Sequence, residues 1–170
     1  MPTETFTYDW TRFVKRVNIN ADATTVFECW ATQTGLEKWF LRQAAFTTAG
    51  GTPRGRNELV QVGDTYSWLW HGWGDDTAEH GTILETNGID QLKFIFGDAG
   101  TVTVTIKTEQ GQTIAELVQE NIPNDEKGKT WYHLGCSTGW VFYMANMKSV
   151  LEGGIDLRNR NVELKNVITA

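Results

Sequence analysis

The chain has few cysteines, no excess of positive charge and no long apolar run. Its 170 residues include two cysteines, Cys29 and Cys136, and their spacing predicts neither a disulfide framework nor a thiolate metal site. Fifteen Lys and Arg stand against 21 Asp and Glu, and the basic residues are scattered. This pattern gives no electrostatic footprint for nucleic acid or an anionic membrane surface, so neither is expected as a partner.

Targeting and membrane signals are also missing from the sequence. No apolar run approaches the roughly 18 to 20 residues that span a bilayer. The first ten residues, MPTETFTYDW, lack the basic and apolar regions of a signal peptide. We therefore expect a cytoplasmic protein with reduced thiols, and the length fits a single domain, residues 1–170, that buries its own core.

The sequence lacks the motifs that accompany covalent catalysis. It contains no G-x-S-x-G, no phosphate-binding glycine loop and no zinc-binding H-E-x-x-H. We therefore name no catalytic residue and expect no cofactor. An enzyme could still use one group in a cavity as a general acid or base, and His80 or Glu116 would qualify if its side chain faced inward.

What the sequence does contain is an ordered series of periodic segments. Alternation over residues 10–19 predicts a strand, and Val26–Phe40 carries apolar residues at helical spacing, with Thr34 as the predicted cap of a second short helix. An amphipathic helix is predicted from about residue 137 to 151. Period-two segments separated by hairpin turns predict five further strands, at 65–73, 78–85, 91–96, 101–108 and 112–120.

The remaining segments are predicted as loops. Residues 49–63 carry four glycines and a proline, which indicates a hairpin or flexible loop with a short strand at Glu58–Val62. Residues 121–136 begin near a proline and a charged cluster and are predicted to form a polar loop. On the last helix, the helical period places Asn146 on the side opposite the apolar stripe.

This order of elements predicts an α+β fold. One curved antiparallel sheet must bury its apolar face against the last helix, and such an arrangement favours a cavity over a solid two-layer sandwich.

Six short segments, in this order, resemble the START-like (SRPBCC, helix-grip) superfamily. Within it, the chain is most similar to the homologue family of the ninety-kilodalton heat-shock-protein ATPase activator, and the resemblance covers about residues 13–158. The segments are Val26-Phe-Glu-Cys-Trp30, Leu36-Glu-Lys-Trp39-Phe40, Gly81-Thr-Ile83-Leu-Glu85, Leu92-Lys-Phe94-Ile-Phe96, Ala115-Glu-Leu117-Val-Gln119, and Gly139-Trp140 with Leu151-Glu152-Gly153.

The resemblance implies a curved antiparallel sheet wrapped around a long C-terminal helix, with two short helices after the first strand. It also implies a cavity between sheet and helix. Members of the superfamily bind lipids, steroids or aromatic polyketides, act as cyclases or hydroxylase components, or serve as co-chaperone domains, so the fold leaves the function open.

The residues expected to line this cavity are mostly aromatic. Large rings occur on both faces of the segment Tyr66–Trp73, and flat apolar ligands suit aromatic walls with a few polar tips. The same rings could instead simply fill the core. Gln119 would place an amide in an apolar row, where it needs a ligand, a water or a neighbouring side chain as its hydrogen-bond partner. The candidate ligand-binding residues are Trp39, Tyr66, Trp68, Trp70, His80, Phe94, Phe96, Gln119, Trp140, Tyr143, Met144 and Met147.

Four polar residues around one predicted hairpin, His71, Asp75, Asp76 and His80, could in principle supply metal ligands. Aspartates are expected in turns for turn chemistry alone, and no third imidazole or thiolate lies near in sequence. We therefore predict no metal site. The lone His133 is expected to be a satisfied or surface residue.

The leading functional prediction is binding of a small hydrophobic or aromatic molecule between sheet and helix, without covalent chemistry. The first alternative is a co-chaperone-like interaction domain with a chaperone as partner. The second is a cyclase, isomerase or hydrolase acting on an aromatic compound. A homodimer through the sheet's outer aromatic row or the C-terminal tail is also left open.

Overall fold

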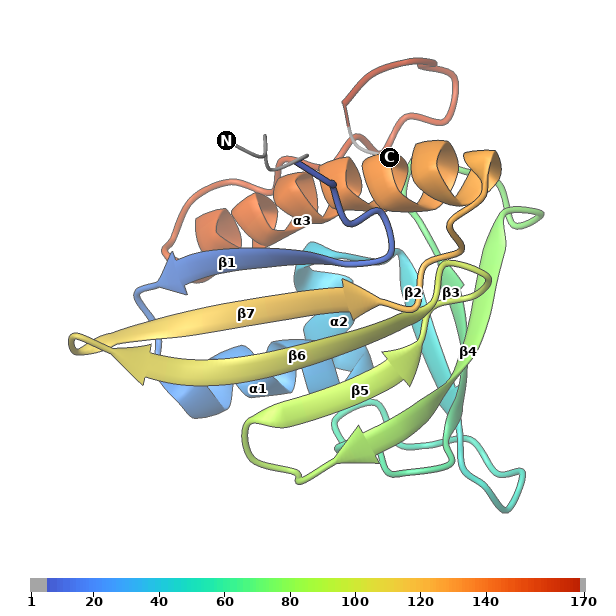
Figure 1. Cartoon of the computed structure of the whole chain (residues 1–170). Coiled ribbons are helices and arrows are strands. Elements are labelled where there is room, and N and C mark those ends of the chain that lie inside the picture. Colours follow the sequence, from blue (N-terminus) through green and yellow to red (C-terminus); the bar gives the residue numbers. More distant parts are fainter. Residues whose placement is uncertain (1–5, 169–170) are drawn as a thin grey trace.

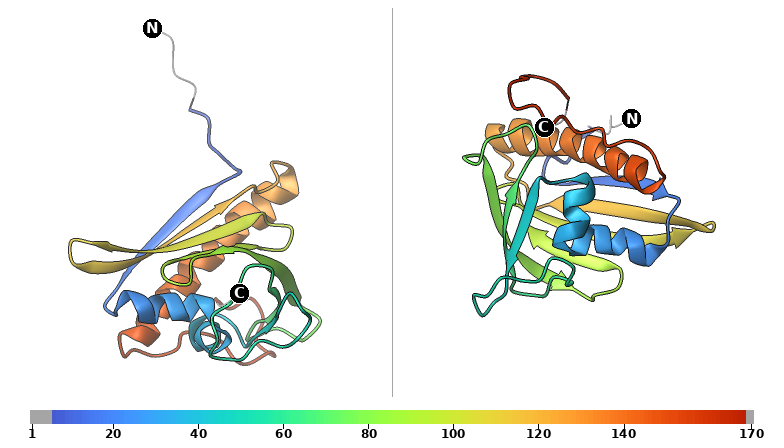
Figure 2. Two further views of the ribbon diagram at one scale, coloured as in Figure 1. Left: turned by 90° about the horizontal axis from the view of Figure 1, so that it is seen from below. Right: turned by 180° about the vertical axis from the view of Figure 1, so that it is seen from behind.

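The computed structural model describes residues 6–168, in which a curved antiparallel sheet holds the helices on its concave side (Figure 1). The view from behind in Figure 2 shows the two short helices and the long C-terminal helix on this same side. The strands are β1 Phe13–Ile19, β2 Gln43–Thr47, β3 Thr65–Leu69, β4 Ala78–Thr86, β5 Gln91–Ile95, β6 Thr101–Glu109 and β7 Gln112–Glu120. The helices are α1 Ala23–Ala31, α2 Gln33–Trp39, the π-helical segment η1 Gly128–Gly135 and α3 Cys136–Leu151.

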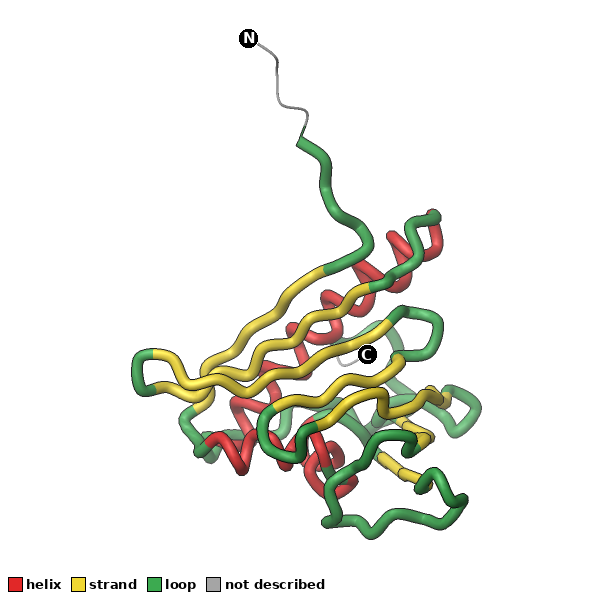
Figure 3. The backbone as a smooth tube through the Cα atoms, turned by 60° about the horizontal axis from the view of Figure 1, so that its bottom comes forward, coloured by secondary structure: helices red, strands yellow, loops and turns green. Residues whose placement is uncertain are grey.

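The sheet has the strand order β1-β7-β6-β5-β4-β3-β2, and every neighbouring pair is antiparallel. Its curvature is visible along the strands in Figure 3. The register shifts between Ile83 and Glu85, where β4 pairs with β5. Bulges of this kind bend a strand and increase its twist, which helps the sheet to wrap around α3. The predicted α+β helix-grip architecture is therefore confirmed.

The strand periodicity gives the sheet its inner face. On β6, Val102, Val104 and Ile106 are buried, and their neighbours on β7 are Gln119, Leu117 and Ala115 in register. Alternate side chains of a strand point to opposite faces, so this row packs towards the helices.

The two short helices begin at side-chain caps. Asp22 accepts a hydrogen bond from the backbone N–H of Thr25 at 2.8 Å, and Thr32 accepts one from Gly35 at 2.9 Å. The sequence-based choice of Thr34 as the second cap was wrong, because Thr32 already satisfies a free N–H at that helix start. Within residues 6–168, no helix is long and apolar enough to cross a membrane.

The predicted polar loop over 121–136 is also wrong in its second half. Residues 128–135 form η1, which runs directly into α3. Asp125 accepts a hydrogen bond from the backbone N–H of Gly128 at 2.7 Å, so an aspartate in the charged cluster satisfies the first N–H of this segment. π-helical turns are rare and frequently mark functional sites.

Two strand predictions are corrected, one in length and one in existence. The strand predicted at 65–73 ends at Leu69, because Gly72 turns the chain with a φ of 83° and Arg42 donates a hydrogen bond to the carbonyl of Trp70 at 3.3 Å. No strand forms at 58–62. That loop is held instead by the ion pair of Arg54 with the buried Asp64.

The chain after α3 packs back onto the end of α2. The buried guanidinium of Arg158 donates to the carbonyls of Leu41 and Lys38, each at 3.0 Å, and also to that of Glu37. Asn146, predicted to face away from the core, is fully buried because its amide donates to the carbonyl of Trp39 at 2.7 Å. A side-chain amide that is hydrogen-bonded to the backbone can be buried at low cost, so the helical period alone gave the wrong face for Asn146.

Candidate functional site

Most of the space between the sheet and α3 is occupied by side chains. The rings of Tyr66 and Trp68 stack with centroids 3.8 Å apart, and Phe94 lies edge-on to Trp68 at 5.4 Å. We call this part of the molecule the filled interior. The candidate residues that it contains are Trp39, Tyr66, Trp68, Phe94, Met144 and Met147, all of them buried.

Two hollows that share Phe96 and Cys136 lie at the start of α3. The acidic cleft, of about 540 Å³, is lined by Glu79, His80, Phe96, Gly97, Asp98, Ala99, Tyr132 and Cys136. The aromatic cleft, of about 150 Å³, is lined by Phe40, Trp70, Phe96, Trp131, Gly135, Cys136, Gly139, Trp140 and Tyr143. Among the candidate residues, Trp70, His80, Phe96, Trp140 and Tyr143 are found here.

Two glycines on one side of the helix keep the aromatic cleft open. A Cβ atom at Gly139 would meet no atom within 4 Å, and one at Gly135 would meet only the carbonyl of Thr130 at 3.8 Å. Glycine inside a helix costs roughly 0.5–1 kcal/mol relative to alanine. Both glycines line the aromatic cleft, and a larger side chain has room at either position.

Gln119 is buried, and its amide is satisfied by the protein itself. The indole N–H of Trp140 donates to Oε1 of Gln119 at 2.8 Å, and Nε2 of Gln119 donates to the carbonyl of Ala99 at 2.9 Å. The hydrogen-bond partners of Gln119 are therefore a neighbouring side chain and a backbone carbonyl, and no ligand is needed to satisfy its amide. This amide holds the ring of Trp140 in place at the wall of the aromatic cleft.

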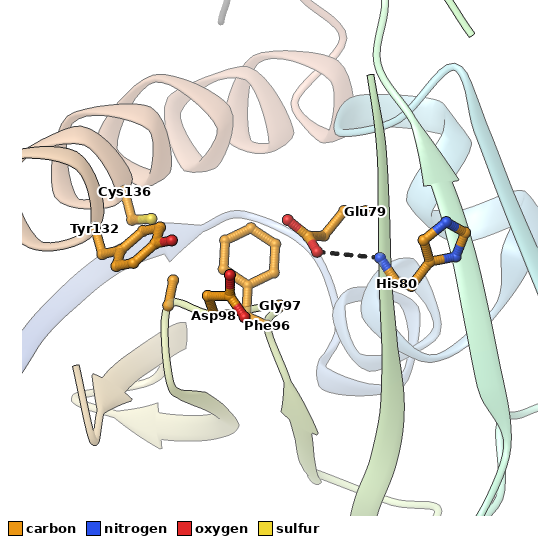
Figure 4. Close-up of a pocket in the computed structure, with 8 residues that line it drawn as sticks. Glu79, His80, Phe96, Gly97, Asp98, Tyr132 and Cys136 are labelled. Atoms are coloured by element: carbon orange, nitrogen blue, oxygen red, sulfur yellow. Dashed lines mark hydrogen bonds between the residues drawn. The ribbon is translucent and has the colours of Figure 1, made fainter. Parts of the chain in front are cut away.

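Glu79 is the inward polar residue that the sequence analysis missed. It lies opposite Trp68 in the β3–β4 register and therefore shares the inner face with Gly81 and Ile83. Figure 4 shows its carboxylate pointing into the acidic cleft, towards Phe96, while the ring of His80 points away on the other side of β4. Alternate residues of a strand share one face, so counting back in steps of two from the apolar Ile83 would have identified Glu79 as an inward residue.

Burial raises the pKa of the Glu79 carboxyl, and the charge of Asp98 adds to the shift, while the backbone N–H of His80 opposes it. Burial also raises the pKa of the Cys136 thiol. A thiol with a raised pKa is a poor nucleophile at neutral pH, so Cys136 contributes surface to the cleft and no obvious covalent chemistry.

The other acidic and histidine candidates lie outside the clefts or serve the fold. Glu116 points to the outer face, where it pairs with Arg16 and Lys107. Asp75 pairs with Arg42. Among the residues that the structure describes, no three His, Cys, Asp or Glu side chains come together in a way that could hold a metal ion.

His133 is buried and satisfied, as expected for a lone histidine. Its Nδ1 lies 2.8 Å from the carbonyl of Trp10, and its Nε2 lies 2.8 Å from the hydroxyl of Tyr8. The first contact requires a proton on Nδ1, and in the neutral ring Nε2 then accepts from Tyr8. The segment before β1 is thereby joined to η1, and η1 forms one wall of both clefts.

A curved antiparallel sheet around a C-terminal helix, with an aromatic hollow between them, defines a helix-grip protein of the START-like class. Residues 20–152 match the family model described as "Activator of Hsp90 ATPase homolog 1-like protein". The chain belongs to this family.

Solved structures with low sequence identity share the fold. Protein SSP2350 from Staphylococcus saprophyticus has a TM-score of 0.66 at 16% identity, covering 87% of this chain and 96% of its own. The Aha1 dimer from Colwellia psychrerythraea has a TM-score of 0.64 at 17% identity, covering 84% and 97%. DynU16, a putative protein in the dynemicin biosynthetic locus, has a TM-score of 0.63 at 14% identity, covering 84% and 47%. The search of curated proteins found no match.

Proposed function

We propose that the protein binds a small apolar or aromatic molecule across the aromatic and acidic clefts, without covalent chemistry. The observation that carries this proposal is the pair Gly135 and Gly139, which line the aromatic cleft. The helix has room for a larger side chain at both positions, yet both are glycine. A chain selected only for stability would gain from filling it.

The size and lining of the clefts support a ligand of one or two fused rings. Pockets for small molecules usually measure about 300–1,000 Å³. The aromatic cleft alone, at about 150 Å³, is too small. The adjoining acidic cleft, at about 540 Å³, lies within this range by itself, so a ligand that reaches from one cleft into the other has enough space. The rings of Phe96 and Trp140, whose centroids lie 5.5 Å apart, would contact an apolar ring.

The test fills the hollow without harming the helix. We expect the neutral fluorescent probe N-phenyl-1-naphthylamine to bind the native protein with a Kd of about 1–10 μM, which corresponds to roughly −7 to −8 kcal/mol. Gly139→Leu should weaken binding at least about tenfold. Its stability should stay the same or rise by up to about 1 kcal/mol, because leucine favours a helix over glycine.

The matched control is Val141→Leu, on the exposed side of the same helix, where the side chain is 55% exposed. It should bind the probe like the native protein. Unchanged affinity in Gly139→Leu, with the helix intact by circular dichroism, would refute binding at this site.

A second candidate function is a co-chaperone-like contact with a chaperone, as the family description suggests. The feature that favours it is a group of exposed apolar side chains on η1 and α3, namely Trp131, Leu134 and Val141. Monomeric proteins rarely leave large apolar groups together on the surface without a use. Stimulation of an Hsp90 ATPase, lost in Leu134→Asp but kept in Gly139→Leu, would favour this function over ligand binding.

A further inference from the structure

The carboxylate of Glu79 is half-buried, and within residues 6–168 it forms no ion pair. The hydrogen bond that it accepts within residues 6–168 comes from the backbone N–H of His80 at 3.1 Å, and no Lys or Arg in this part of the chain forms an ion pair with it. The partly buried acids Glu37, Glu116 and Asp156, by contrast, each pair with arginine. Burying an unpaired carboxylate is costly.

The fold is shaped to keep this carboxylate where it is. A Cβ atom on Gly97 would collide with the carboxylate of Glu79, and Gly97 has a φ of 48°, a conformation that glycine adopts without strain. The β5–β6 turn thus supplies both the space for Glu79 and a second acid, Asp98, in the same cleft. Figure 4 shows the ring of Phe96 between Glu79 and Tyr132.

We infer that the two clefts select an aromatic molecule that carries a protonated amine. The ammonium group lies in the acidic cleft and donates to Glu79, while the ring lies in the aromatic cleft. This inference rests on the proposed function and specifies, in addition, that the ligand carries a positive charge.

Three features of the clefts favour a cation over a neutral or anionic group. Two acids, Glu79 and Asp98, line the acidic cleft, and none of its lining residues is Lys or Arg. An ammonium group also interacts favourably with the face of a neighbouring aromatic ring, here that of Phe96. An anionic group would instead face two carboxylates at short range in a half-buried site.

Lys127 lies at the edge of the acidic cleft, where it contacts Tyr132 and forms no ion pair with Glu79 among the described residues. The ammonium of Lys127 lies 5.1 Å from the ring centroid of Tyr132. The hydrogen bond with Tyr132 is the main cause that raises the pKa of Lys127, and Asp98 and Asp125 contribute further. Lys127 therefore leaves the carboxylate of Glu79 available to a ligand.

The experiment compares three ligands of one shape and different charge by calorimetric titration at pH 7. These are 1-naphthylmethylamine, which is protonated, 1-naphthalenemethanol, which is neutral, and 1-naphthoate, which is anionic. We expect the amine to bind at least about tenfold more tightly than the alcohol, since a hydrogen bond to a charged group contributes roughly 1.5–3 kcal/mol, or about 10- to 100-fold. We expect the acid to bind most weakly.

Two variants test whether the preference for the amine over the alcohol depends on the carboxylate of Glu79. Glu79→Gln should reduce the ratio of amine to alcohol affinity to about one. Glu85→Gln, on the same strand but paired with Lys93, should leave the ratio unchanged. Melting curves of both variants establish that each is folded.

The possible outcomes separate this inference from the proposed function. Equal binding of amine and alcohol by the native protein, or an unchanged ratio in Glu79→Gln, would overturn the cationic ligand while leaving the site in place. Failure of all three ligands to bind would overturn the proposed function and the inference together.

Discussion

The filled interior and the two clefts are built from the same kinds of side chain but behave differently. Around Trp68 the rings pack on one another, and the indole is 1% exposed. Around Phe96 the rings face a hollow. Gly139 contributes no side chain to its aromatic part, and Glu79 contributes a carboxylate in place of an apolar group to its acidic part. An abundance of aromatic residues therefore does not locate a binding site. The proposed site lies where small residues and a charge interrupt the aromatic packing.

The largest expected difference between the two regions is in stability. Trp68→Ala should lower the free energy of unfolding by roughly 3–5 kcal/mol, as large-to-small changes in a packed core do. Trp70→Ala, beside the aromatic cleft, should cost less than about 2 kcal/mol because its ring is only partly buried. Denaturant midpoints at unchanged slope give both values. Equal losses would show that Trp70 belongs to the core as much as Trp68 does.

The contact of the C-terminal segment with α2 links both regions. Arg158 binds the carbonyls at the end of α2, from which Trp39 enters the filled interior and Phe40 reaches the aromatic cleft. Arg158→Ala should lower stability by about 3 kcal/mol, because it leaves the buried carbonyls without their donor and removes one of the two arginine partners of Asp156. The control Arg160→Ala, with a side chain 64% exposed, should cost under about 1 kcal/mol.

The smallest expected effect concerns the pH dependence of stability. The folded state raises the pKa of Glu79 through burial, so it binds the proton more tightly than the unfolded chain does. Ionised Glu79 then destabilises the fold, and stability falls as pH rises from below its ordinary value of 4.5 through its folded pKa.

At pH 7 the Glu79→Gln variant should therefore have a higher melting temperature than the native protein. Near pH 4, where Glu79 is largely protonated, the two melting temperatures should be equal. Glu85→Gln is the control and should show no such crossover. A variant that is less stable than the native protein at pH 7 would mean that the fold uses the negative charge of Glu79, and the stated reason for its lack of a partner would then be wrong.

The sequence was sufficient for the strands and helices that have a clear period. The hairpin turns and the row Val102, Val104 and Ile106 predicted both the sheet and its inner face. It was insufficient where tertiary contacts override local pattern. Asn146 is buried because the carbonyl of Trp39 is available to it, and η1 forms where a charged cluster suggested a loop.

The candidate site could be predicted only in part for the same physical reason. Aromatic type predicts burial, but it does not indicate which rings pack on each other and which face a hollow. The candidates named from the sequence include Trp68 and Met147, which are buried in the interior, and His80, whose ring points outward. Strand alternation applied to β4 would have pointed to Glu79. The role of Gly139 depends on what lies opposite the helix, which only the folded structure shows.

The central claim is that a ligand sits at the start of α3 and not in the filled interior. The most direct measurement is the set of intermolecular NOEs between bound 1-naphthalenemethanol and assigned protein side chains. The account predicts contacts from the naphthalene protons to the rings of Phe96 and Tyr143 and to the Hα atoms of Gly139, with none to the methyl group of Met147. Contacts to Met147 without contacts to Phe96 would contradict it.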